Sequence, residues 1–113
     1  MEKGIQEKIQ RLQLIEENLN TYLGQKQQVQ GQLLELESAT VALADAKASY
    51  RIIGNIMVER PAAELTKDLA EKAERTKVRL AALERQEERL KQQAESLQQE
   101  IVKGMKGDGH GEL

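Results

Sequence analysis

The chain has 113 residues, of which 17 are basic and 19 are acidic, and its formal net charge is −2. It contains no cysteine, tryptophan or phenylalanine, which excludes a disulfide framework and a thiolate metal site and argues against an aromatic-rich globular core. Acidic residues are interspersed among the basic ones, so we expect no nucleic-acid partner. No apolar run approaches the ~18 residues needed to cross a bilayer, so we expect a soluble, cytoplasmic chain without membrane association.

A long apolar stripe with helical spacing occupies the first part of the chain. Its steps alternate between three and four residues, with one extra step of three near Leu12. A repeat that averages about 3.5 residues over this length is typical of a coiled coil. We therefore predict a first helix over about residues 3–47. All its members except Lys26 and Thr40 are apolar: Ile5, Ile9, Leu12, Ile15, Leu19, Tyr22, Lys26, Val29, Leu33, Leu36, Thr40 and Leu43.

Residues 49–60 do not fit the coiled-coil pattern. Two runs rich in β-branched residues flank Gly54 and Asn55, which predicts a β-hairpin with a two-residue turn and a positive φ at the glycine. In this register Ile53 lies opposite Ile56, and Ile52 lies opposite Met57.

Both faces of this predicted hairpin carry apolar residues. A lone two-stranded hairpin is marginally stable in water, and its outer edges invite further strands. We therefore expect hairpins from several chains to join in a shared sheet or barrel. The residues expected to form this oligomerisation surface are Tyr50, Ile52, Ile53, Ile56, Met57 and Val58.

A second helix is predicted over about residues 62–105. Pro61 suits the entry to a helix, and Gly104 and Gly107 are expected to end it near Met105, leaving a flexible tail at 107–113. The stripe of this helix is apolar except at Thr76 and Glu87, and consists of Leu69, Ala73, Thr76, Leu80, Leu83, Glu87, Leu90, Ala94, Leu97 and Ile101.

The two stripes are nearly equal in length and the segment between them can reverse the chain. The predicted fold is therefore mainly α: a single domain over 1–113, in which a long antiparallel two-helix coiled coil has a β-hairpin between its helices. If the helices pair about Gly54 and Asn55, the numbers of facing residues sum to about 109. An arm of ~42 residues would then be roughly 60 Å long.

Nothing in the sequence indicates an enzyme. The single histidine, His110, lies in the glycine-rich tail, and no nucleophile–base spacing or metal-ligand cluster is present. We predict no catalytic residues, no cofactor and no metal site. A structural coiled coil, such as a stalk or tethering subunit of a larger complex, would explain the two stripes but not the apolar hairpin.

The order helix, hairpin, helix resembles the prefoldin family, and the segment from Tyr50 to Val58 is similar to the hairpin of its β-type subunits. The charged stretch from Leu83 to Leu90 is similar to that family's second helix. The presence of one hairpin segment indicates the β-type, with the archaeal form as the nearest match. The resemblance implies a hexamer of two α and four β subunits that acts as an ATP-independent holdase. Such a chaperone captures non-native proteins at the coiled-coil tips and passes them to a group II chaperonin.

The free end of the predicted coiled coil holds more apolar residues than one seam requires, because Leu14 and Val102 lie off the stripes. Fraying of the helix termini could expose apolar side chains to a client protein, although all of them could instead close the seam. Guided by the resemblance, we expect client binding at Ile5, Ile9, Leu12, Leu97, Ile101, Val102 and Met105.

Overall fold

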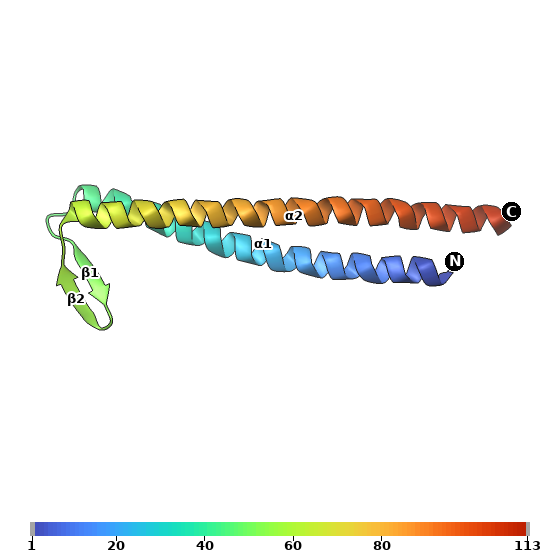
Figure 1. The fold of residues 1–113 in the computed structure, drawn as a ribbon, viewed down its shortest axis with the longest axis horizontal. Coiled ribbons are helices and arrows are strands. Elements are labelled where there is room, and N and C mark those ends of the chain that lie inside the picture. The colour runs from blue at the N-terminus through green and yellow to red at the C-terminus, as the bar shows by residue number, and fades with distance from the viewer. Residues whose placement is uncertain (1, 113) are drawn as a thin grey trace. The chain divides into compact units, whose positions relative to one another are not determined.

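A computed structural model describes the backbone of residues 2–112 and the side chains of residues 4–106. Helix α1 (Glu2–Ala44) is followed by strands β1 (Tyr50–Ile53) and β2 (Ile56–Glu59), and then by helix α2 (Ala62–Glu112), as Figure 1 shows. The predicted fold class, two long helices with an antiparallel hairpin between them, is therefore confirmed. The chain divides into two compact units. One, here called the terminal unit, contains Met1–Gln25 and Leu83–Leu113; the other, the hairpin unit, contains residues 26–82.

The terminal unit is held together by an apolar seam between the two helices. Ile15, Ala94 and Leu97 are buried, and Leu12, Leu19 and Leu90 pack against them. At the far end of the seam, a Cβ atom built on Gly104 would lie 3.3 Å from the side chain of Ile5. These contacts fit the predicted antiparallel register, in which Ile5 faces Gly104 and Leu12 faces Leu97.

One position of the predicted stripe is wrong. Ile9 is 37% exposed, whereas the neighbouring Lys8 is half-buried and its Nζ lies 3.9 Å from Oε1 of Glu100. A regular heptad runs through Ile5, Lys8 and Leu12, and it removes the irregular step that the apolar residues alone suggested. The aliphatic stem of lysine can cover a seam while its ammonium group stays in water, so the charge at position 8 concealed the repeat.

In the hairpin unit, the seam contains one fully buried side chain and two well-accommodated polar ones. Val29 is only 1% exposed. Thr40 and Thr76 occupy seam positions, and each donates a hydrogen bond from its hydroxyl to a backbone carbonyl one turn earlier in its own helix, to Leu36 at 2.8 Å and Lys72 at 2.7 Å. Because their hydroxyls are satisfied locally, these threonines contribute their methyl groups to the seam without leaving an unpaired polar group.

The ends of the helices differ in part from the expected ones. Helix α1 ends at Ala44, slightly before Lys47, and α2 begins at Ala62, immediately after Pro61. The Pro61 carbonyl accepts hydrogen bonds from the backbone N–H groups of Glu64 and Leu65 at 3.1 and 3.3 Å. At its other end α2 extends to Glu112, beyond the expected end near Met105 and through most of the predicted tail; Leu113 lies outside the described residues. A helical glycine costs only about 1 kcal/mol relative to alanine, so glycines without a following proline do not force a helix to end.

Candidate functional site

The turn of the hairpin has the geometry that its sequence predicts. Gly54 has a φ of 61°, and no non-glycine residue of the described chain has a positive φ. A positive φ at the first central residue alone is typical of a type II′ turn, which matches the twist of the two strands. The predicted pairs Ile53–Ile56 and Ile52–Met57 are confirmed, and Arg51 pairs with Val58.

The strands expose a concentration of apolar side chains, here called the hairpin surface. Its members are between 50% and 73% exposed: Tyr50, Ile52, Ile53, Ile56 and Met57. Val58, also predicted to belong to the oligomerisation surface, is half-buried, as is Arg51 opposite it. Within residues 2–112 the sheet has two strands, so each strand has one edge that no other described strand pairs. Exposed apolar side chains and open edges together make the hairpin suited to adding strands from other chains.

A groove of about 940 Å³ lies between the hairpin and the helical part of the hairpin unit. Tyr50, Ile52 and Met57 line it from the strands. Its helical wall combines the apolar residues Ala39, Ala42, Leu43, Leu65 and Leu69 with the charged residues Asp68, Glu71, Lys72 and Arg75. One side of the hairpin surface is therefore continuous with apolar side chains of the coiled coil.

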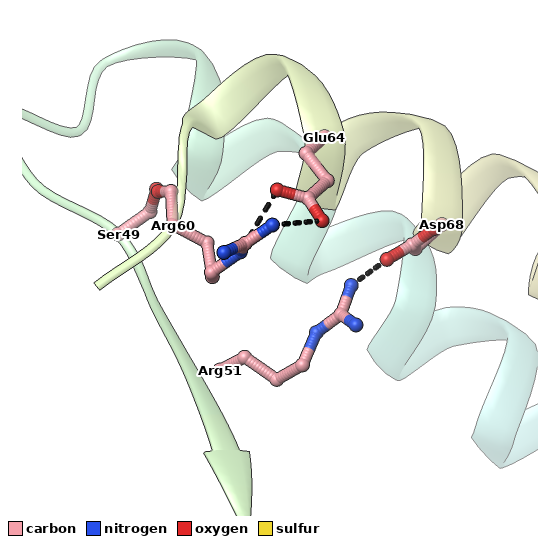
Figure 2. Close-up of polar contacts among 5 residues, drawn as sticks. All are labelled: Ser49, Arg51, Arg60, Glu64 and Asp68. Carbon is pink, nitrogen blue, oxygen red and sulfur yellow. Dashed lines mark hydrogen bonds and ion pairs between the residues drawn. The ribbon is translucent and has the colours of Figure 1, made fainter. Parts of the chain in front are cut away.

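The base of the hairpin is closed by polar contacts (Figure 2). The Arg60 N–H donates to the Ser49 carbonyl at 3.0 Å, and the Ser49 hydroxyl donates to the Arg60 carbonyl at 2.6 Å. Ser49 is buried. These two bonds extend the pairing of the strands by one residue on each side, where the chain enters and leaves the helices.

Arg60 also forms a two-pronged ion pair with Glu64 in the first turn of α2. Its Nε and Nη2 donate to the two carboxylate oxygens at 2.9 and 2.8 Å. The hydrogen bond from Arg60 is the main reason why the pKa of Glu64 is lowered, and the same bond raises the pKa of Arg60. Arg51 adds a smaller electrostatic effect that also lowers the pKa of Glu64.

A second arginine reaches α2 from within the hairpin. The guanidinium of Arg51, on β1, forms an ion pair with the carboxylate of Asp68 (Figure 2). Glu64 and Asp68 place negative charge near the start of α2, where the helix dipole favours it, and no role was assigned to either arginine from the sequence. The spacing of Arg60 and Glu64 across Pro61 was a usable signal for their pair, but the Arg51–Asp68 pair depends on how the hairpin is oriented within its unit.

The residues predicted to bind clients fall into two groups in the terminal unit. Leu97 and Ile101 are buried at 4% and 8% exposure, and Ile5 and Leu12 are half-buried in the same seam. In contrast, Ile9, Val102 and Met105 are 37%, 49% and 59% exposed. The structure thus brings together the predicted residues at one end of the seam but presents only three of them to solvent.

These three exposed residues lie on one flank of the terminal unit. Each directly follows a seam residue: Ile9 follows Lys8, Val102 follows Ile101 and Met105 follows Gly104. In an antiparallel pair of helices, the residue that directly follows a seam residue points to the same side of the pair on both helices. We call Ile9, Val102 and Met105 the tip flank. Leu14, which is 57% exposed, precedes a seam residue and faces the other side.

Two kinds of feature are not found in the described part of the chain. Residues 2–112 contain no helix that is both long and apolar enough to cross a membrane. Among the side chains that the structure describes, no three His, Cys, Asp or Glu residues are placed to hold a metal ion. The candidate functional features of the described residues are the hairpin surface and the tip flank.

Comparisons with known proteins identify relatives of the same architecture. The family described as "Prefoldin subunit" matches residues 6–108. The prefoldin subunit beta of Archaeoglobus fulgidus is 31% identical over 100 residues, covering 86% of both chains. That of Methanospirillum hungatei is 28% identical over 106 residues, covering 91% of this chain and 88% of the relative. The crystal structure of the prefoldin beta subunit from Thermococcus strain KS-1 superimposes with a TM-score of 0.86 at 29% identity, covering 89% of this chain and 91% of that one.

Proposed function

The chain belongs to the prefoldin family, and from this membership we propose that it is the β-type subunit of an ATP-independent holdase chaperone. In this proposal the assembled protein binds non-native proteins at the free ends of its coiled coils and delivers them to a group II chaperonin in the cytoplasm. It performs no enzymatic reaction and requires no cofactor.

The observation that carries this proposal is the hairpin surface. Its five apolar residues are at least half exposed, and they lie in a sheet whose two outer edges have no strand partner in this chain. A stable fold rarely leaves so much apolar surface beside open strand edges unless another chain covers it. We propose that Tyr50, Ile52, Ile53, Ile56, Met57 and Val58 join the hairpins of other prefoldin subunits, in a hexamer of two α-type and four β-type chains.

Client binding is proposed at the tip of the terminal unit. Ile9, Val102 and Met105 are already accessible to an apolar segment of a client. Burial of apolar surface contributes roughly 25 cal/mol per Å² before the cost of ordering is subtracted, so several weak contacts on several subunits would be needed. The seam residues Ile5, Leu12, Leu97 and Ile101 would contact a client only when the end of the coiled coil frays.

Assembly can be tested by co-expressing the chain with an archaeal α-type prefoldin subunit and measuring native mass. We expect the wild-type chain to give the mass of a complex of two α and four β chains. Ile53→Lys/Ile56→Lys should abolish it while helical circular dichroism is retained, because burying an unpaired charge is costly. The matched control Leu34→Lys/Val41→Lys changes equally exposed apolar residues of α1 and should leave the mass unchanged. An unaltered mass for the hairpin variant would overturn this mode of assembly.

A structural stalk is the alternative function. A stalk protein would account for the paired helices but would not protect other proteins. Light scattering of a chemically unfolded enzyme distinguishes the two: the proposed function predicts that the assembled complex suppresses aggregation without ATP. A stalk would leave the aggregation unchanged.

A further inference from the structure

The hairpin is connected to the helices by contacts that differ in what they can restrain. The bonds between Ser49 and Arg60 lie across the base of the hairpin. They hold the strands together where the chain enters and leaves the hairpin. Because they lie at the point about which the hairpin would tilt, they do not fix its angle to α2. The orientation of the hairpin relative to the start of α2 must therefore depend on contacts made farther from the base.

Arg51 supplies such a contact, and Arg60 adds a second ion pair to the same helix from the base of the hairpin. Arg60 directly follows β2 and binds Glu64, whereas Arg51 lies within β1 and binds Asp68. Glu64 and Asp68 are four residues apart, so their carboxylates lie on one face of the first turns of α2. Among the ion pairs of the described residues, that between Arg51 and Asp68 is the one that joins a strand to a helix.

From this arrangement we infer that Arg51 and Asp68 position the hairpin for assembly. Strand β1 and the residue that follows β2 are each tied to the same face of α2, which restricts the directions in which the hairpin surface can point. An interface whose parts are already oriented loses less conformational freedom on association. The inference rests on the proposed assembly through the hairpin and adds a positioning role for two residues that lie outside the apolar surface.

Exchanging the charges of Arg51 and Asp68 tests their positioning role while both charges stay in the chain. Arg51→Glu places a carboxylate beside Asp68 and Glu64, and Asp68→Arg places a guanidinium beside Arg51. Each single variant should raise the subunit concentration at half assembly by about fivefold, as expected for an exposed ion pair worth ~1 kcal/mol. Arg51→Glu/Asp68→Arg should restore the wild-type value. Exchanging the exposed pair Lys77 and Glu74 is the matched control and should have no effect.

The orientation itself can be measured in the isolated chain, so this test does not depend on assembly. Because the sequence has no cysteine, Asn55→Cys and Val78→Cys provide two unique sites for spin labels, at the hairpin turn and on an exposed face of α2. Pulsed electron paramagnetic resonance should give a narrow distance distribution for wild type, a broad one for Arg51→Glu, and a narrow one again for the double exchange. Equal widths for wild type and Arg51→Glu would overturn the inference. Failure of the wild-type chain to assemble would instead count against the proposed function.

Discussion

At the scale of single residues, the Arg60–Glu64 ion pair has a measurable consequence for titration. The pKa of Glu64 is lowered mainly by the hydrogen bond from Arg60. A carboxyl group with a lowered pKa in the folded state stabilises that state above its ordinary pKa, and the contribution is lost as the pH falls through the lowered value. The contribution of this ion pair at the base of the hairpin should therefore be lost only in acid.

We predict that Arg60→Gln returns the pKa of Glu64 toward its ordinary value, because the hydrogen bond and the nearby positive charge are both removed. The side-chain carboxyl signal of Glu64 in an NMR pH titration gives this value directly. Lys77→Gln, which changes a distant exposed lysine of α2, should leave it unmoved. An unchanged titration of Glu64 in Arg60→Gln would show that the pair does not form in solution.

Val29 provides a residue-scale test of the seam in the hairpin unit. Val29→Ala should lower the free energy of unfolding by about 1–3 kcal/mol, because the lost methyl groups leave a space that the surrounding side chains fill only partly. Val41→Ala makes the same change in the same helix at a side chain that is 71% exposed, and should change stability by less than about 0.5 kcal/mol. Urea unfolding followed by circular dichroism compares the two variants. Equal losses of unfolding free energy would show that Val29 is not a buried residue of the seam.

At the scale of elements, two glycines should respond oppositely to the same substitution. Gly54→Ala should destabilise the hairpin by about 1–2 kcal/mol, because alanine resists the positive φ of the turn. Gly31→Ala should stabilise α1 by about 0.5–1 kcal/mol, since no heavy atom lies within 4 Å of the added methyl group. Thermal unfolding of the helices measures the second effect, and the concentration at half assembly reports the first. A stabilising Gly54→Ala would contradict the type II′ turn.

The antiparallel register of the terminal unit can be tested with introduced disulfides. Cysteines in place of Leu19 and Leu90, which pack against the same buried cluster, should oxidise within one chain, because facing seam positions approach the ~4.4–6.8 Å Cα separation that disulfides need. Cysteines in place of Leu19 and Ile101 should not, since eleven residues of helix move the partner about 16 Å along the axis. Mass analysis after proteolysis identifies the linked peptides. Preferential linkage of the second pair would refute the register.

The elements themselves could be predicted because each depends on a local pattern. Alternating steps of three and four revealed both helices, and the glycine–asparagine turn fixed which residues pair across the strands. The place of Lys8 in the seam was missed because the neighbouring Ile9 is apolar and also fits a helical spacing. The extension of α2 past Gly104 was missed because a small loss of helix propensity was interpreted as a stop.

The polar contacts at the hairpin base were less accessible to sequence reasoning. The link between Arg51 and Asp68 joins residues whose proximity depends on the path of the chain from the strands into α2, and no periodic pattern encodes that path. For the predicted client residues, the sequence identified the apolar end of the seam. It could not separate the buried Leu97 and Ile101 from the exposed Val102 and Met105, because that distinction requires the packing of both helices.

At the scale of the whole molecule, assembly and client binding are proposed for two different units. We propose that the hairpin unit carries the surface for assembly and that the terminal unit carries the surface for clients. Each unit has its own buried residues, Val29 in the former and Ile15, Ala94 and Leu97 in the latter. Substitutions of exposed residues in one unit should therefore leave the fold and the role of the other unaffected.

The central claim is that the assembled protein holds clients at the tip flank, and aggregation of a chemically unfolded enzyme tests it most directly. The assembled complex carrying Ile9→Gln/Val102→Gln/Met105→Gln should keep its native mass but lose most of its suppression of light scattering. The matched variant Leu34→Gln/Val41→Gln/Val78→Gln removes three apolar residues that are even more exposed, at 64%, 71% and 67%, and should protect the enzyme as well as wild type does. Full protection by the tip-flank variant, or its loss in the matched variant alone, would contradict the account.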